Sequence, residues 1–295
     1  MAGATTTTLS TAIQKTFPAM VETEDQVKTP LRNFLPIVPS LSGNSYDWKV
    51  HYGGNTSSTT YSEGDAVSAA GNETYADATL ASSSGYARTM VQFTGHAVDA
   101  MKGGYFQGIE NELRYAIQKH LKYKEGLAIT ALEAALDSSG SYAGLTRATY
   151  KMETTEAAGT PTLAELITMW TTLTDDAIAM DMSQAWLLMP PDTIDLYNAV
   201  ATGIAYFEFP SVVNGVVDAG KLQRMPSYNG RPIHQIVGLT SAITLCFSPE
   251  TGVKLVTFRE PQIEQMGKND DSTVFSITSS EILVVENPKM AGKIT

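Results

Sequence analysis

Residues 53–85 form a long stretch of Gly, Ser, Thr and Ala that holds almost nothing a hydrophobic core could use. The stretch lies between two strand-like runs, 46–52 and 86–93, in which large and polar residues alternate. Compact domains rarely tolerate a connection of this length unless it has a function of its own. The pattern therefore predicts a two-stranded arm, with each run carrying one of its sides.

Such an arm, with about 17 residues on each side, would reach roughly 55 Å at ~3.3 Å per residue. A compact chain of 295 residues has a radius of gyration of only about 19 Å. Isolated two-stranded hairpins are marginally stable in water, so the arm needs support from outside its own domain. A neighbouring copy of the same chain is the natural support, and the sequence indicates assembly before catalysis.

Composition excludes several classes of protein. A hydrophobic content of 43% is enough for one large domain or two lobes, and no run approaches the ~20 apolar residues of a membrane span. The start, Met1 to Thr5, lacks the pattern of a signal peptide, so we expect synthesis in the cytoplasm. With a net charge of -11 and no Lys/Arg cluster interleaved with aromatic residues, tight binding to duplex DNA is not expected.

The first half of the chain is predicted to contain an extended segment and a long helix. Four prolines before residue 44 should break any helix there except one near residues 9–15. From Tyr105, apolar residues recur every three or four positions as far as Leu136, which predicts one helix of about 32 residues. Glycine has a low helix propensity, so a kink or a break at Gly126 is an alternative to a continuous helix.

The second half mixes helices with strands. A capping box after Pro161 predicts a helix, and the apolar run 185–189 predicts a strand followed by a short helix from Asp192 to Val200. Asn229-Gly230 predicts a hairpin. Residues 242–247 and three candidates between 253 and 285 complete the strands, with a turn at 267–271. The fold class is α+β.

No residue is predicted to be catalytic, to bind a metal or to bind a cofactor. The four histidines lack ligand spacing and are expected on strand or helix surfaces, and His96 with Asp99 lacks a nucleophile. Cys246 lies in an apolar strand pattern and is expected to be a core thiol. The acidic pairs at 175–176 and 270–271 are typical of solvated helix ends and turns.

The order of these elements resembles the major capsid proteins of tailed bacteriophages, which share the Hong Kong ninety-seven fold. Short phrases along nearly the whole chain agree with this resemblance. They are Glu63-Gly64-Asp65-Ala66, Tyr86-Ala87-Arg88 with Val91, Gly144-Leu145-Thr146, Trp186 to Thr193, Gly230-Arg231-Pro232-Ile233 and Val284-Val285-Glu286-Asn287-Pro288.

The resemblance implies four parts and one function. The parts are an N-terminal arm (1–44), an extended loop (45–98), a peripheral lobe with a spine helix (99–140 plus 250–295) and an axial lobe (141–249). The function is a closed icosahedral shell of pentamers and hexamers around double-stranded DNA, with no reaction and no cofactor.

Assembly contacts are expected on the arm and at the turn near the C-terminus. Glu63 is expected to pair with Arg88 across the joint between subunits. The full set is Tyr61, Glu63, Val67, Tyr75, Leu80, Arg88, Lys268, Asn269, Asp270 and Asp271.

The expected partners follow from the resemblance. The chain would contact other copies of itself, a portal, packaged DNA without sequence-specific contacts and, in some particles, a decoration protein, but no membrane. Only about 44 residues precede the loop, so scaffolding is expected to come from a separate scaffolding protein or to be unnecessary. Some relatives crosslink a loop lysine to an asparagine, here Asn269 with Glu264 or Glu281 as the base. No lysine lies between Lys49 and Lys102, so no crosslink is expected.

Two alternatives remain at this stage. An encapsulin-type nanocompartment shell would share the fold and enclose an enzyme instead of DNA. A carbohydrate-binding or hydrolytic β-rich protein would explain the Ser/Thr-rich strands, but it would not need the helix after Tyr105. The capsid protein accounts for both features, and its place would be the virion, after synthesis in the host cytoplasm.

Overall fold

The computed structural model describes residues 30–40, 43–53, 74–95, 106–137, 140–146, 153–155, 164–165, 167–168, 185–200, 205–213, 216–228, 231–240, 242–246, 252–269, 272–287 and 291–294. Among the expectations above, the helix near residues 9–15, the tip of the arm and the pair His96 and Asp99 lie outside these residues.

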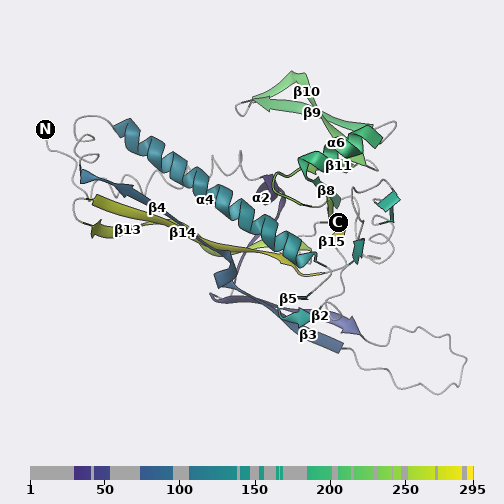
Figure 1. Ribbon diagram of the computed structural model, residues 1–295, viewed down its shortest axis with the longest axis horizontal. Helices are drawn as coiled ribbons and strands as arrows, with labels where there is room; N and C mark the ends of the chain where they lie inside the picture. Colours follow the sequence, from purple (N-terminus) through teal and green to yellow (C-terminus); the bar gives the residue numbers. More distant parts are fainter. Residues whose placement is uncertain are drawn as a thin grey trace, which may run out of the picture.

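The centre of the molecule is helix α4 (Phe106–Ala135) on a four-stranded sheet (Figure 1). The strand order is β1 (Ile37–Pro39), β13 (Val253–Asn269), β14 (Ser272–Val285) and β4 (Tyr86–Phe93). β1 runs parallel to β13, and the other pairs are antiparallel. The long helix predicted from Tyr105 is confirmed, and of the alternatives left open at Gly126 the structure has the continuous helix. Apolar residues at every third or fourth position of α4 pack on this sheet.

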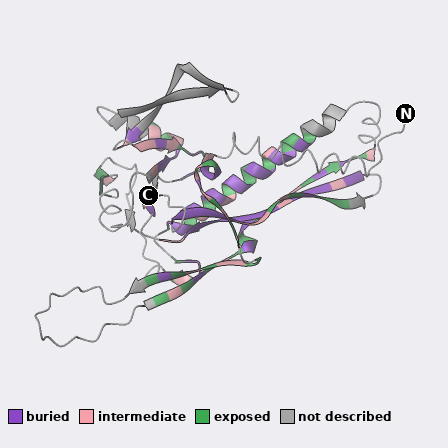
Figure 2. Cartoon of the chain, turned by 180° about the vertical axis from the view of Figure 1, so that it is seen from behind, coloured by how far each residue is buried: buried purple, intermediate pink, exposed green. Residues whose placement is uncertain are grey.

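Two clusters of buried side chains hold α4 in place. Its first half packs Leu113, Ile117 and Leu121 against Phe275 and Ile277 of the sheet. Its second half belongs to a larger core, whose members include Leu31, Leu132, Leu136, Leu188, Leu255 and Leu283. Figure 2 shows the buried residues along α4 and along the long strands β13 and β14. α4 therefore joins both cores.

A seven-stranded sheet lies beyond the second half of α4 (Figure 1). Its order is β7 (Glu153–Thr155), β15 (Ala291–Ile294), β12 (Ala242–Cys246), β8 (Ala185–Met189), β11 (Arg231–Gln235), β10 (Val216–Tyr228) and β9 (Ala205–Val213), and α6 (Pro191–Val200) follows β8. Tyr228 pairs with Arg231, which confirms the hairpin predicted from Asn229-Gly230. The strand at 185–189 is also confirmed.

The predicted pairing of the arm is wrong in one respect. β2 (Ser45–Gly53) pairs with β3 (Thr74–Ala81), and 86–93 is not the returning side of the arm. Instead, β4 pairs with β14, because Ala87, Val91 and Phe93 form a buried face that packs beside α4. The 3-10 turn η1 (Ser82–Gly85) joins β3 to β4.

Three further expectations need correction. Pro30 starts a short helix, α2 (Pro30–Phe34), since proline is compatible with the first position of a helix. Two long strands, β13 and β14, replace the three predicted between 253 and 285, because bulges absorb the irregular pattern of β13. α6 begins at Pro191, and the Pro190 carbonyl accepts a hydrogen bond from Ile194 N, so Asp192 lies inside the first turn.

Gly85 is required where η1 crosses β14. A Cβ at this position would lie 1.9 Å from the carbonyl oxygen of Glu281 and 2.7 Å from Ile282 Cγ2. Because the carbonyl oxygen and carbon of Glu281 belong to the backbone of β14, this overlap cannot be relieved by a side-chain rotation alone.

We predict opposite effects for two glycine substitutions. Gly85→Ala should lower the free energy of unfolding by about 3 kcal/mol, the upper part of the range for overpacking. Gly126→Ala should raise it by about 1 kcal/mol, because a Cβ there meets open space on a helix. Denaturant unfolding of both variants measures the difference, and equal effects would contradict the close packing of η1.

Candidate functional site

A groove of about 500 Å³ lies between β4 and α4. β4 is the last strand of its sheet, so among the described strands only β14 pairs with it. Arg88, Met90 and Gln92 line one wall, and Tyr115 and Lys119 lie on the other. An unpaired strand edge beside a helix offers backbone donors and acceptors to an extended segment.

Exposed apolar side chains gather on and beside this groove. Among the described residues, nine large apolar side chains are about half exposed or more. Three of the nine line the groove: Met90, Tyr115 and Tyr123. A fourth, Tyr86, begins β4, the strand that forms one wall. Such a concentration of exposed apolar surface is typical of an interaction site.

The charge of the groove differs from that of the whole chain. Arg88 and Lys119 outnumber Glu112 among the lining residues, whereas the chain carries a net charge of -11. Lys119 Nζ also lies 5.8 Å from the centre of the Tyr115 ring. The groove therefore suits an acidic, extended segment.

Beneath the groove, His120 of α4 forms hydrogen bonds with both β4 and β14. Its Nδ1 lies 3.0 Å from Thr89 Oγ1 and its Nε2 lies 2.9 Å from Ser279 Oγ. Only 1% of this residue is exposed, so the expectation of a surface histidine is wrong here. Burial, and then the charge of Lys124, lower the pKa of His120 to about 4. The neutral ring suits the site, since the hydroxyl groups of Thr89 and Ser279 can each donate or accept.

A buried ion cluster joins three elements behind the groove. Glu281 of β14 binds Arg32 of α2 through two hydrogen bonds (2.6 and 3.0 Å), and its Oε2 lies 2.8 Å from Lys124 Nζ. Glu125 accepts hydrogen bonds from the backbone N–H groups of Leu31 (2.8 Å) and Arg32 (3.3 Å). The cluster holds α2 against α4 and the sheet.

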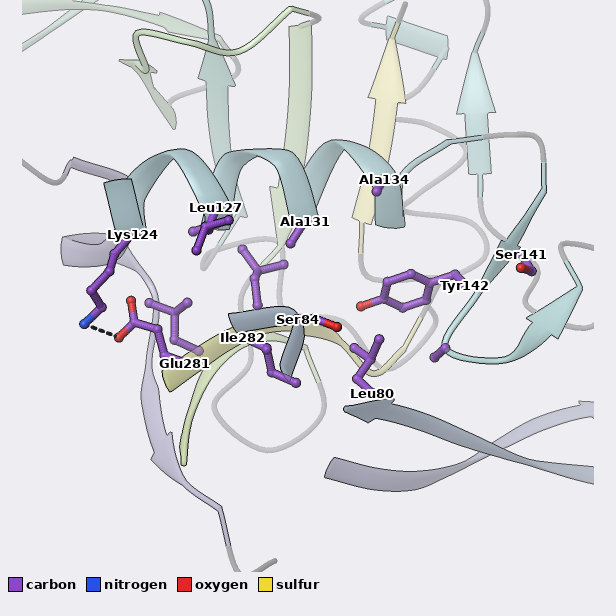
Figure 3. A pocket seen from close by; sticks show the side chains of 14 residues that line it. Leu80, Ser84, Lys124, Leu127, Ala131, Ala134, Ser141, Tyr142, Glu281 and Ile282 are labelled. Carbon is purple, nitrogen blue, oxygen red and sulfur yellow. Dashed lines mark ion pairs between the residues drawn. The ribbon is translucent and has the colours of Figure 1, made fainter. Parts of the chain in front are cut away.

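The ion cluster borders an apolar pocket of about 270 Å³ (Figure 3). Figure 3 shows Lys124 and Glu281 at one end of the pocket and Tyr142 toward the other. The small side chains of Ala131 and Ala134 leave the space on the α4 side. Since Glu281 and Lys124 satisfy each other, the pocket presents mainly apolar surface.

The structure brings few of the predicted contact residues together. Arg88 lines the groove. Leu80 faces inward and packs near Ile282, while Tyr75 is exposed on the opposite face of β3 with its ring 5.0 Å from His51. Lys268 and Asn269 end β13, but their side chains are not described. The remaining predicted contacts, which are Tyr61, Glu63, Val67, Asp270 and Asp271, lie outside the described residues.

Sequence reasoning missed the α4 side of the groove. Tyr115, Lys119 and Tyr123 recur every four residues, which places them on one face of the helix. That face is opposite the buried residues Leu113 and Ile117. The spacing was visible in the sequence, but the proximity of Arg88 was not.

The described part of the chain contains no group of three or more His, Cys, Asp or Glu residues that could hold a metal ion. None of its helices is both long enough and apolar enough to cross a membrane. The side chain of Cys246 is not described, so its expected burial stays a prediction.

We predict that Glu281→Gln destabilises the protein by about 3–5 kcal/mol. Removing one partner leaves the buried cations Arg32 and Lys124 without their carboxylate. Glu264→Gln is the matched control, since Glu264 pairs with Arg259 on the surface, and its effect should stay within about 0.5 kcal/mol. Chemical denaturation measures both, and a mild effect of Glu281→Gln would show that the cluster contributes little.

We also predict a loss of stability as the pH falls from 6.5 to 4. The unfolded chain takes up a proton at histidine near pH 6.5, whereas folded His120 does so only near pH 4, so the unfolded state binds more protons between these values. Replacing His120 by Gln should reduce the slope of stability against pH by up to about 1.4 kcal/mol per pH unit in this window. Burial also lowers the pKa of His234 to about 4, so His234→Gln should act in the same direction. Identical slopes for wild type and His120→Gln would contradict this assignment.

Comparison with known proteins gives matches in structure only. No family model and no curated protein sequence matches this chain. Its structure is similar to the capsid subunit of cyanophage A-1(L), with a TM-score of 0.67, 13% identity and coverage of 91% of this chain and 92% of that one. The capsid of an empty GTA particle gives a TM-score of 0.57 at 11% identity, covering 90% and 89%.

A non-viral shell matches as well. The encapsulin complex of Synechococcus elongatus gives a TM-score of 0.55 at 13% identity, with coverage of 91% of this chain and 88% of that one. Nearly the whole chain takes part in each match, so the similarity includes both sheets and α4. The chain therefore has the shell-protein fold of the tailed-bacteriophage major capsid proteins, which the encapsulin shares.

Proposed function

We propose that this chain is a structural major capsid protein, which assembles as pentamers and hexamers into a closed icosahedral shell around double-stranded DNA. The observation that carries the proposal is the combination, in one chain with this fold, of a projecting hairpin and an exposed groove. Each is incomplete in a single subunit, because the hairpin extends away from the body and the groove leaves apolar surface exposed.

The two features are complementary in charge. Residues 54–73, which connect β2 to β3 in the sequence, contain Glu63, Asp65 and Glu73 but no Lys or Arg. The groove offers Arg88 and Lys119. We propose that this segment of one subunit lies on the groove of the next, where Glu63 pairs with Arg88.

The direction of the hairpin supports contact between subunits. In Figure 1, β2 and β3 point away from the end of the molecule where β4 and the first half of α4 lie. The paired part of the hairpin, from Ser45 to Gly53, spans about 30 Å at ~3.3 Å per residue. A hairpin directed away from its own groove is free to reach a neighbouring copy.

The parts of the fold can be assigned by the same analogy. We propose that α4 is the spine helix and that it forms the peripheral lobe with the four-stranded sheet. The axial lobe is the seven-stranded sheet with α6, and it includes β15 from the C-terminus. The extended loop is limited to residues 45–81, since β4 belongs to the sheet under α4. Residues 1–44 are the N-terminal arm, fixed at α2 by Arg32.

The partners are proposed by analogy as well. They are other copies of the chain, a portal, a separate scaffolding protein, packaged DNA and, in some particles, a decoration protein, all in the virion. An encapsulin-type shell is the second candidate, and the similarity to the Synechococcus encapsulin supports it. The contents of purified particles separate the two, since a virion holds DNA and a nanocompartment holds an enzyme.

We predict that the purified protein forms closed particles and that reversing the charge of the groove prevents this. The double variant Arg88→Glu, Lys119→Glu should stay monomeric, because the acidic segment of a neighbour would meet like charge. Its thermal stability should match the wild type, as Arg88 and Lys119 are exposed. Electron microscopy and sedimentation measure assembly.

The matched control is Lys122→Glu, which changes an exposed lysine of α4 outside the groove and should leave assembly intact. Particles from the double variant would refute the role of the groove, and a wild type that forms no particles under any condition would refute the shell.

A further inference from the structure

The β2–β3 hairpin rests on the body through one apolar face. Tyr46 pairs with Leu80, and Trp48 pairs with Ala78, so these residues share a side of the two-stranded sheet. That side packs on the buried residues Ile282 and Val284, among others. Apolar contacts of this kind tolerate sliding and small rotations, since they are not directional. One backbone hydrogen bond, from Thr79 N–H of β3 to the carbonyl of Ala143 (3.0 Å), also attaches the hairpin, and the apolar face by itself does not set the angle of β2.

A polar contact lies at the edge of this apolar face. The hydroxyl group of Tyr46 donates a hydrogen bond to Glu286 Oε1, and Lys254 Nζ lies 2.7 Å from the same oxygen. Lys254 Nζ also lies 5.2 Å from the centre of the Tyr46 ring. The lysine and glutamate side chains are only 6% and 14% exposed. Together, Tyr46, Lys254 and Glu286 form what we call the hairpin clamp.

The clamp joins the hairpin to the end of the longest strand pair of the molecule. Lys254 is the second residue of β13, and Glu286 directly follows β14, where its N–H bonds to the carbonyl of Gly252 (3.3 Å). Tyr46 is the second residue of β2. A hydrogen bond depends on direction as well as distance, so the clamp restricts the rotation that the apolar face allows.

We propose that the hairpin clamp fixes the angle at which the β2–β3 hairpin leaves the body, and through that angle sets the curvature and diameter of the shell. The inference rests on the proposed function, since it assigns a role to Tyr46 within assembly. Tyr46 is thus a positioning residue. It acts at the base of the hairpin, away from the segment that we place on the neighbouring subunit.

The protonation states are consistent with a clamp at neutral pH. Burial and the neighbouring Glu286 raise the pKa of Tyr46, so its hydroxyl group keeps the proton that it donates. Burial lowers the pKa of Lys254, but Glu286 and Tyr46 raise it by more, so the ammonium group stays charged. The clamp therefore keeps one donor, one cation and one shared carboxylate.

The length of the hairpin makes the angle important. A rotation of about 10° at the base moves the far end of β2 by about 5 Å, given a paired length of about 30 Å. Residues 54–73 connect the far ends of β2 and β3 in the sequence, so the intersubunit contacts that we propose for them depend on this position. Side-chain contacts between subunits are lost over such distances, so neighbouring subunits must change their mutual tilt to restore them.

The test compares Tyr46→Phe with Tyr75→Phe. The first variant removes only the hydroxyl group that reaches Glu286, and the second removes a hydroxyl group from the exposed face of the same hairpin. Glu286→Gln is a second variant, because it keeps an acceptor for Tyr46 and removes the charge that holds Lys254. Two measurements apply: hydrogen exchange of residues 45–53 and 74–81 in dissociated subunits, and particle diameter by electron microscopy.

We expect Tyr46→Phe and Glu286→Gln to speed hydrogen exchange in the hairpin by roughly ten- to a hundredfold, which corresponds to the loss of one hydrogen bond to a charged group. Exchange in β13 and β14 should stay unchanged. Particles of both variants should differ from the wild type in mean diameter or spread over several diameters, whereas Tyr75→Phe should match the wild type in both measurements.

The two measurements separate the clamp from the shell. Unchanged exchange in Tyr46→Phe would overturn the clamp even if particles form normally. Faster exchange with particles of wild-type diameter would overturn the control of curvature. An equal effect of Tyr75→Phe would show that any change in the hairpin alters assembly, and would also overturn it. If the wild type forms no particles, the proposed function fails, while hydrogen exchange still tests the clamp.

Discussion

The fold depends on one buried carboxylate. Glu281 binds Arg32 from α2 and Lys124 from α4, and its own backbone carbonyl lies against Gly85 of η1. Four segments that are far apart in the sequence thus meet at a single residue of β14. The charges are satisfied only when all of these segments are in place, because a buried ion without its partner is costly. This requirement makes the arrangement of α2, α4 and the sheet specific, whereas the apolar cores alone would tolerate several packings.

The surfaces that remain open follow from this arrangement. The buried face of α4 packs on the sheet. Its exposed residues Tyr115, Lys119 and Tyr123 line the groove beside the edge strand β4. The hairpin buries one face against Ile282 and Val284 and extends away from the body. One rigid centre therefore carries both a projecting element and a receptive groove. In the proposed shell, each subunit would place its hairpin segment on one neighbour and would bind the hairpin segment of another neighbour in its groove.

The sequence predicted the individual helices and strands better than it predicted which strands pair and which side chains meet. The period of α4, the turn at Asn229-Gly230 and the apolar strand at 185–189 are local patterns, and each is found in the structure. Strand pairing is not local. The run 86–93 has the alternation of an arm strand, but it pairs with β14, almost two hundred residues away. Burial of His120 and the meeting of Arg88 with Tyr115 likewise result from tertiary packing, which no single segment encodes. The overall fold was still recognisable, because the order of helices and strands along the chain does not depend on which strands pair.

The open edge of β4 has a consequence for the life of the subunit before assembly. Among the described strands only β14 pairs with β4, and its other edge, on a strand with exposed Tyr86 and Met90, can also pair with the wrong chain. In the proposed assembly, Arg88 and Lys119 would act as gatekeepers, since like charges repel a second, identical edge but attract an acidic segment. The same two cations that favour the correct partner would therefore keep free subunits from aggregating, so that solubility and correct assembly are selected together.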